Sequence, residues 1–313
     1  MRRSVWPQYS NACRSAVQSL LEAGGSLSAY RANPQVGVEP RLNSYACRFE
    51  RQLEMRMKVD YAVACSSGTA ALQTSIIATL GRPGSSAREI IVSPFSFSAS
   101  ASAIVLAGYT PVFADVDVQS GCISKATVKK AITKRTAAIL PVALFGAMHD
   151  DFSSYDLPVI SDSCQAVGNS VGLRGNVAAY SMNGGKNIPA GECGAVVTNS
   201  KRIADAVRYM MNHGENFGKE IGYNYRPNEL TCCVAYHGLL ELVENNRQRI
   251  ALAEILTNYI RAEKKLRAYI EIPESVKFDG SHVFYCYPFK IRGMSRSIFA
   301  KRMQLRFSRV VGE

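Results

Sequence analysis

Short apolar runs alternate with longer stretches of helical pattern through the first half of the chain. The apolar runs fall at residues 61–65, 89–93, 111–116, 137–142 and 157–161. Helical patterns at residues 69–80 and 99–107 follow the first two of them. Short apolar strands separated by crossover helices are typical of a parallel sheet that is buried on both faces. The pattern therefore predicts an α/β fold, with a mainly parallel central sheet and helices on both faces.

The pattern changes in the last quarter of the chain. A charged helical stretch at residues 239–267 leads into a region whose clearest predicted strand is residues 283–289. We therefore place a domain boundary near residue 240. Residues 1–240 are expected to form a large domain with an N-terminal arm, and residues 241–313 a small C-terminal α+β domain.

Composition narrows the class of protein. The chain has 313 residues, of which 47% are hydrophobic and 20% charged, which suits a soluble globular protein with one large domain and possibly a smaller one. No apolar run approaches the ~20 residues of a membrane helix, so we expect no membrane partner. The nine cysteines show no CxxC spacing, which predicts reduced thiols in a cytoplasmic protein and no metal site.

The formal net charge of +12 is unevenly distributed. Seven Lys and Arg residues lie between Lys290 and Arg309, and the only acidic residue after them is Glu313. Such a run is commonly a solvated helix face, but it can also attract an anionic substrate. Because no zinc-finger or RNA-recognition motif accompanies it, a nucleotide-linked small molecule is favoured over nucleic acid.

Residues 66–72, Ser-Ser-Gly-Thr-Ala-Ala-Leu, join a predicted strand to a predicted helix. The unpaired N–H groups of a first helical turn, together with nearby hydroxyls, suit a phosphate. Ser181 could add a further hydroxyl to the same phosphate. The alternative interpretation of this segment is an ordinary N-cap with a glycine turn.

Three further side chains have the chemistry of a pyridoxal-phosphate (PLP) site. Asp162 directly follows a predicted strand, where its carboxylate could pair with a protonated ring nitrogen. Gln165 would lie near the ring oxygen or a carbonyl. Phe97 could stack on the ring, with Phe95 as a competing candidate. A capping aspartate and a core aromatic are the alternatives at Asp162 and Phe97.

Lys186 lies between two strand-like segments, residues 177–180 and 195–198, on a predicted tight turn of small residues. A lysine amine held in this way can reach a carbonyl and form a Schiff base. Most lysines in glycine-rich loops are only solvated. Lys186 is a candidate because residues suited to bind the phosphate and the ring of PLP precede it in the sequence.

The order of these motifs resembles the DegT/DnrJ/EryC1/StrS family. The matching segments are Ser-Ser-Gly-Thr-Ala-Ala-Leu at residue 66, Gly-x-x-Pro-Val-Phe-x-Asp-Val-Asp at residue 108, Asp-x-x-Gln at residue 162, Ser-x-x-x-x-Lys at residue 181, and Gly-Tyr-Asn-Tyr-Arg at residue 222. Members are PLP-dependent sugar aminotransferases of fold type I, the aspartate-aminotransferase-like fold. Relatives continue for several dozen residues where this chain ends, so we expect a shortened C-terminal domain.

The resemblance implies a role for each candidate residue. Lys186 would form the Schiff base and act as the catalytic base, and Asp162 would hold the pyridine nitrogen. Gln165 would be a second ring contact and Phe97 the stacking residue. The phosphate would be held by Gly68, Thr69, Ala70, Ser181 and, from the neighbouring subunit, Asn224. A homodimer with two shared sites is therefore expected.

The expected activity is transfer of an amino group from an amino acid, glutamate in much of the family, to a keto group of a nucleotide-linked sugar or a similar anionic substrate. An alternative keeps PLP but leads to decarboxylation, dehydration or another elimination on a different anionic substrate, including a modified nucleotide or nucleic acid. Retention of Lys186 favours transamination. A non-catalytic regulator that only binds PLP or nucleic acid is the third hypothesis.

Overall fold

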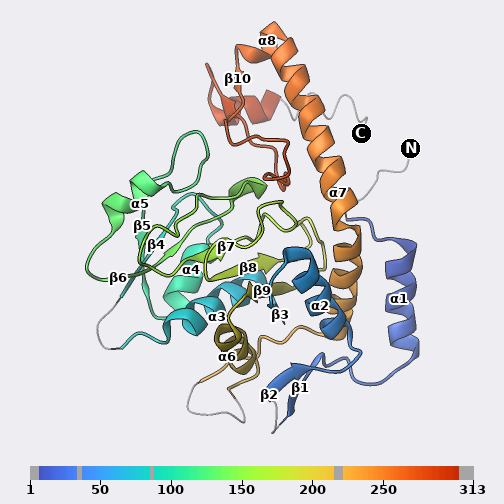
Figure 1. Cartoon of the computed structure of the whole chain (residues 1–313). Helices are drawn as coiled ribbons and strands as arrows, with labels where there is room; N and C mark the ends of the chain where they lie inside the picture. Colours follow the sequence, from blue (N-terminus) through green and yellow to red (C-terminus); the bar gives the residue numbers. More distant parts are fainter. Residues whose placement is uncertain (1–6, 34–36, 85–87, 215–220, 303–313) are drawn as a thin grey trace.

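The computed structural model describes residues 7–33, 37–84, 88–214 and 221–302. Its centre is a mainly parallel sheet in the order β5-β4-β6-β7-β8-β9-β3 (Figure 1). Isolated bridges between Ile139 and Val159 and between Val142 and Asp162 join its two hydrogen-bonded parts. The strands are β3 (Tyr61–Cys65), β4 (Glu89–Val92), β5 (Thr110–Phe113), β6 (Thr136–Leu140), β7 (Ile160–Asp162), β8 (Val177–Ser181) and β9 (Gly194–Thr198).

Strand β9 runs antiparallel to both of its neighbours, and the other strands of this sheet run parallel to one another. The physical reason is the connection between β8 and β9, which is a turn of residues 182–193 without a crossover helix. This turn carries Lys186. The predicted α/β class and the five strands expected from the apolar runs are confirmed.

Helices pack on both faces of the sheet. Helix α3 lies against β8 and β9 and contacts α4 and α6, while α2 packs on β3 and α7 (Figure 1). The connecting helices are α3 (Gly68–Leu80), α4 (Ala99–Leu106), α5 (Lys125–Ala131), α6 (Lys201–Met211) and the short 3-10 turn η1 (Leu144–Gly146). The predicted helices over residues 69–80 and 99–107 are thus confirmed.

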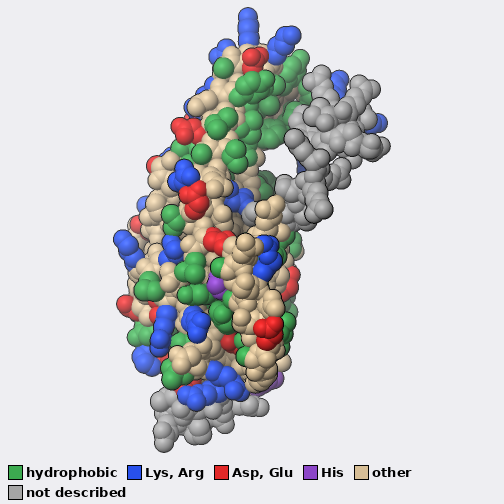
Figure 2. All heavy atoms as spheres, turned by 90° about the vertical axis from the view of Figure 1, so that its right-hand side faces the viewer, with side chains coloured by type: hydrophobic (Ala, Val, Ile, Leu, Met, Phe, Trp, Pro, Cys, Tyr) green, Lys and Arg blue, Asp and Glu red, His purple; other side chains and the backbone are tan. Residues whose placement is uncertain are grey.

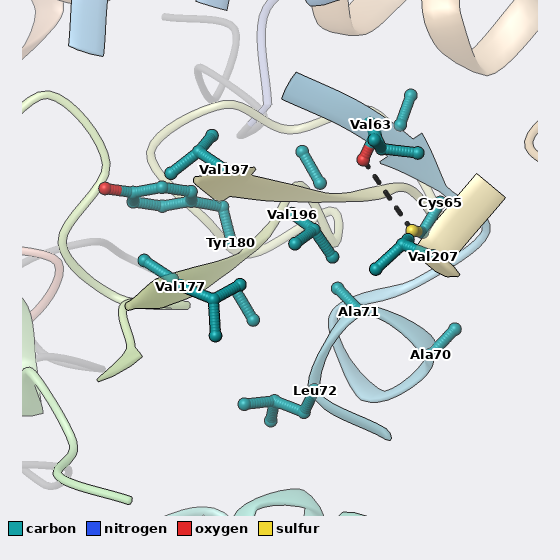
Figure 3. Close-up of a cluster of buried hydrophobic side chains, with 14 of the residues drawn as sticks. Val63, Cys65, Ala70, Ala71, Leu72, Val177, Tyr180, Val196, Val197 and Val207 are labelled. Carbon is teal, nitrogen blue, oxygen red and sulfur yellow. Dashed lines mark hydrogen bonds between the residues drawn. The ribbon is translucent and has the colours of Figure 1, made fainter. Parts of the chain in front are cut away.

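The core forms where α3 and α6 cover β3, β8 and β9. Figure 3 shows buried side chains of the hydrophobic core, including Val63, Leu72, Tyr180 and Val196. Each of these four side chains is at most 1% exposed. Helix α3 is buried on all sides from Ala70 to Ala78, as expected for a helix that is enclosed by a sheet and two other helices.

The N-terminal arm packs against the C-terminal region through their helices. The N-terminal arm contains α1 (Asn11–Glu22), the hairpin of β1 (Tyr30–Asn33) and β2 (Gly37–Pro40), and α2 (Tyr45–Met57). The C-terminal region contains α7 (Glu229–Ala262), α8 (Lys264–Arg267), β10 (Ile270–Glu271) and β11 (Lys290–Ile291). No helix among the described residues combines the length and the apolar character needed to cross a bilayer.

The predicted strand at residues 283–289 is wrong. Phe284 has a φ of 47°, and Pro288 lacks an N–H for a ladder. The segment is instead bonded to η1, because the N–H of Val283 donates to Gly146 O at 3.0 Å and the N–H of Cys286 donates to Phe145 O at 3.2 Å.

The predicted domain boundary near residue 240 falls inside α7, which is continuous from Glu229 to Ala262. The N-terminal half of this helix packs against α1 and α2, and its far end carries α8 and the β10–β11 pair (Figure 1). The division into two domains stays a prediction.

Candidate active site

A cavity of about 350 Å³ opens at the carboxyl ends of β3, β7 and β8. This is the edge at which ligands bind in doubly wound sheets. The cavity brings together residues that are far apart in the sequence, from the start of α3, the start of α4, the end of β7 and the β8–β9 turn. Its lining includes Gly68, Thr69, Phe97, Ser100, Asp162, Cys164, Gln165, Ser181, Asn183, Lys186, Glu192 and Tyr285.

The start of α3 forms one wall. Ser67 caps the helix, and its Oγ accepts a hydrogen bond from the N–H of Ala70 at 3.1 Å. A side chain cannot be accommodated at Gly68, because an added Cβ would lie 2.7 Å from Ser181 Cβ and 3.0 Å from Cys164 Sγ. The glycine therefore lets the positive end of the helix approach the end of β8, which makes a cradle for an anion.

Asp162 forms the floor of the cavity. Its side chain is 5% exposed. One carboxylate oxygen accepts from Ser100 Oγ at 2.6 Å, and the other accepts from the N–H of Cys164 at 3.2 Å. Within the described residues, no Lys, Arg or His lies within ion-pair distance of this carboxylate. A cationic group of a ligand would complete its environment.

The thiol of Cys164, next to Asp162, is not a second anion that could attract the cationic group of a ligand. Burial, and after it the Asp162 carboxylate, raises the pKa of Cys164 well above its ordinary value. The thiol therefore stays protonated and neutral at the edge of the cavity.

Lys186 lies on the predicted tight turn, where its N–H donates to Asn183 O at 2.8 Å. Its ammonium nitrogen is 4.3 Å from the ring centroid of Tyr285, a cation–π contact. The next residue, Asn187, is buried and fixes the turn, because its amide donates to Asn246 on α7 at 2.9 Å and to Val283 O at 3.1 Å.

Seven of the nine predicted site residues line this one cavity: Gly68, Thr69, Phe97, Asp162, Gln165, Ser181 and Lys186. Phe97 is 71% exposed, at the entrance, whereas its competitor Phe95 lines a separate cavity and packs edge-on against Phe145. Ala70 is buried behind the lining, and its N–H is taken by the Ser67 cap. Asn224 is exposed and does not line the cavity of its own chain.

Sequence reasoning missed Ser100 and Tyr285. Ser100 belongs to a helix that was recognised as small-residue, and only the fold shows that its hydroxyl faces Asp162. Tyr285 was assigned to a strand that does not form. Gln165 was expected near a carbonyl or a ring oxygen, and its Oε1 accepts from the N–H of Phe145 at 2.7 Å.

These residues suit PLP. A Cβ-intolerant glycine at a helix N-terminus fits a phosphate, the buried carboxylate without a cationic partner fits a pyridinium, and the half-buried lysine fits an aldehyde carbon. The three groups lie on different walls of one cavity.

Comparisons with known proteins agree with this site. The chain is 30% identical over 268 residues to the 3-oxo-glucose-6-phosphate:glutamate aminotransferase of Bacillus subtilis, covering 81% of this chain and 59% of that protein. It is 32% identical over 227 residues to the GDP-perosamine synthase of Vibrio cholerae, covering 67% and 61%. The chain thus spans about 60% of the length of these relatives.

Among solved structures, the chain matches NtdA from Bacillus subtilis with bound cofactor PMP. The TM-score is 0.78 at 27% identity, and the match covers 93% of this chain and 65% of that one. The architecture is fold type I of the PLP-dependent aminotransferases.

The model of the DegT/DnrJ/EryC1/StrS aminotransferase family matches residues 41–307. This match spans most of the chain and includes every residue of the cavity. The chain belongs to the DegT/DnrJ/EryC1/StrS aminotransferase family, whose members depend on PLP.

Proposed function

We propose that this protein is a PLP-dependent aminotransferase that transfers an amino group from an amino acid to the keto group of an anionic sugar. The observation that carries the proposal is the shared cavity of Lys186, Asp162 and the start of α3. An amine, a buried carboxylate and an anion cradle are the three groups that this chemistry requires of the protein.

PLP supplies an electron sink that stabilises negative charge developing at the α-carbon of a bound amino acid. Lys186 would hold it covalently, and the cradle at Gly68, Thr69 and Ser181 would hold its phosphate. Asp162 would keep the pyridine nitrogen protonated, which maintains the sink. Phe97 would cover the ring at the entrance, and Gln165, already bonded to the Phe145 N–H, would lie beside it.

Lys186 is also the residue best suited to move the substrate proton. Among the described side chains that line the cavity, it provides the only amine. Its turn is anchored through Asn187 to α7 and to the segment that carries Tyr285. An anchored amine can take a proton from the α-carbon of the amino donor and return it to a neighbouring carbon at little entropic cost.

The names of the relatives support a sugar acceptor and a glutamate donor. One relative is named for a glucose 6-phosphate derivative and glutamate, and the other for a GDP-linked sugar. The sugars in both names carry phosphate groups. We propose glutamate as the donor and a nucleotide-linked or phosphorylated keto sugar as the acceptor.

We further propose a cytoplasmic homodimer in which each cavity is completed by Asn224 of the other subunit. Asn224 is exposed and lies outside its own cavity, which leaves it available to another chain. All nine cysteines are free thiols, in keeping with a reducing compartment.

The half-reaction tests the proposal without knowledge of the acceptor. The PLP-loaded protein is mixed with glutamate alone, and 2-oxoglutarate is measured against protein concentration. We expect about one keto acid per active site, and none from Lys186→Ala. Release of carbon dioxide from glutamate without formation of a keto acid would instead identify a decarboxylase. If no keto acid forms, and a sugar supplied in a separate reaction loses water, the protein would be a dehydratase.

A further inference from the structure

The segment that carries Asn224 is fixed by contacts that the proposed chemistry does not use. This segment comprises residues 221–225, which come after α6 in the chain and are exposed or half-buried. Asn224 forms an isolated antiparallel bridge with Asn212, and the N–H of His213 donates to Tyr223 O at 2.9 Å. These backbone contacts bind the segment to the residues that end α6 and directly follow it.

The outer side is held by Arg82, which lies just after the end of α3. Its guanidinium donates to Ile221 O at 2.8 Å and to the Tyr223 hydroxyl at 3.0 Å. It also lies 5.5 Å from the centroid of the Tyr223 ring. One side chain therefore combines two hydrogen bonds with a cation–π contact, which fixes both the backbone and the ring next to Asn224.

The ring of Tyr223 continues the stack inward. It lies 4.7 Å from the ring of Tyr225, with an interplanar angle of 9°. The Tyr225 hydroxyl donates to Gln73 Oε1 at 2.8 Å, and Gln73 is buried in α3. The two tyrosines flank Asn224 in sequence, so fixing both rings fixes the backbone between them.

The same segment is also bonded to the strand-to-helix connection of its own chain, next to the cavity. Tyr225 O accepts from the N–H of Ser66 at 2.7 Å, immediately before the cradle at the start of α3. Loss of the stack could therefore act on the partner's site through Asn224, or on the chain's own site through Ser66. The partner route is favoured because Arg82 bonds residues 221 and 223, whereas the Ser66 contact is a backbone bond that does not require Arg82.

We propose that Arg82 is a positioning residue that acts through Tyr223 to present Asn224 to the active site of the partner subunit. This inference rests on the proposed shared-site dimer. Arg82 is exposed and lies outside the cavity of its own chain. The inference is that it affects cofactor binding in the other chain.

The test uses mixed dimers with one intact site. A donor chain carries Lys186→Ala and keeps Asn224, and an acceptor chain carries Asn224→Ala and keeps Lys186. Different affinity tags allow the mixed dimer to be purified. After PLP titration and borohydride reduction, the pyridoxyl mass is measured on the peptide that contains Lys186, which only the acceptor chain can supply. The half-saturating PLP concentration is therefore read at a single site, without any measurement of turnover.

Arg82→Ala is then placed in one chain at a time. In the donor chain it should raise the half-saturating PLP concentration about threefold to tenfold, the size expected for a lost cation–π contact and an exposed hydrogen bond. In the acceptor chain, whose Asn224 is already absent, it should change this concentration less than twofold. Arg88→Ala, at another exposed arginine of the same connection, is the matched control and should have no effect in either chain.

Substitutions at Tyr223 in the donor chain separate positioning from a general loss of structure. Tyr223→Phe keeps the ring stack and should cost less than Tyr223→Leu, and Arg82→Lys should restore part of the affinity. A shift of equal size from both chains, a shift from the acceptor chain alone, or no shift would overturn the role of Arg82 and leave the shared site intact. If the parent mixed dimer binds PLP no better than the Asn224→Ala homodimer, the shared site itself is wrong, and the inference falls with it.

Discussion

The carboxylate of Asp162 is buried at the end of β7, with Ser100 and the N–H of Cys164 as its hydrogen-bond donors. Asp162→Asn is nearly isosteric, and the Ser100 hydroxyl can accept as well as donate, so folding should be little affected. Turnover should fall about 10- to 100-fold, because a charge-assisted hydrogen bond of about 1.5–3 kcal/mol to the ring nitrogen is lost. Steady-state kinetics beside a thermal melt checks this prediction. Near-wild-type turnover would show that Asp162 does not hold the ring nitrogen and only caps the backbone that follows β7.

A second prediction at the scale of one residue concerns acid stability. His149 is 1% exposed, and its ring contacts Ser161 Oγ at 2.7 Å and Asp150 O at 2.6 Å. Burial lowers the pKa of His149 to about 4, whereas an unfolded histidine titrates near about 6.5. Between these values the unfolded chain binds a proton that the folded chain excludes. The free energy of unfolding should therefore fall as the pH drops from 6.5 towards 4.

At pH 5 the contribution of His149 to this loss is about 2 kcal/mol relative to pH 7. Denaturant unfolding of the wild type and of His149→Gln at both pH values measures it. The variant should lose about 2 kcal/mol less than the wild type on acidification. If both proteins lose the same free energy of unfolding between pH 7 and pH 5, protonation of His149 does not cause the loss of stability in acid.

At the scale of the element, the start of α3 depends on a residue without a side chain. Gly68→Ala should weaken PLP binding at least about tenfold and destabilise the fold by about 1–3 kcal/mol, because its Cβ would meet Ser181 Cβ at 2.7 Å. Gly84→Ala is the matched control, since an added Cβ there meets nothing within 4 Å. PLP titration and denaturant unfolding measure both effects. Unchanged PLP affinity in Gly68→Ala would exclude a close approach of the cofactor to this turn.

The sheet could be predicted from the sequence because most of its strands, though not the edge strand β5, are buried on both faces. Residues 61–65 and 137–142 are continuous apolar runs, and such runs distinguish strands from their crossover helices. The same signal failed at residues 283–289. Aromatic residues there are buried by loop contacts with η1, and hydrophobicity alone does not reveal the positive φ of Phe284. The N-terminal hairpin and α1 were not predicted, because the arm is polar on average, although α1 has an amphipathic pattern.

The site was predictable as far as it depends on local motifs. Gly68, Asp162 and Lys186 lie at or shortly after the carboxyl ends of β3, β7 and β8, so the edge they share follows from the topology. Ser100 and Tyr285 enter the cavity only through long-range packing, from the side of α4 and from a C-terminal segment. No short motif marks either of them.

At the scale of the whole molecule, the distribution of charge bears on the substrate. Lys290 and Arg292 are both bonded to Glu271, and Arg306 and Arg309 lie outside the described residues. On the face shown in Figure 2, Lys and Arg side chains are interspersed with acidic and neutral ones. Neither observation singles out a continuous basic track, and both agree with a small anionic substrate.

Charge reversal at the exposed Lys301 and Arg302 tests whether the basic run recruits this substrate. Recruitment predicts a higher KM with little change in kcat, together with a shallow dependence on salt for a nucleotide-linked sugar. Reversal of Lys264 and Lys265, an exposed basic pair on α8, is the control. A salt slope of several units would point to nucleic acid, and no response would make the run a solvated face.

The central claim is that Lys186 holds PLP in the cavity at the end of β8. Its most direct test is borohydride reduction of the PLP-saturated protein, followed by proteolysis and mass spectrometry. The pyridoxyl mass should lie on the peptide that contains Lys186 and disappear in Lys186→Ala. A label on another lysine, or no label on saturated protein, would contradict the assignment of this cavity as the active site.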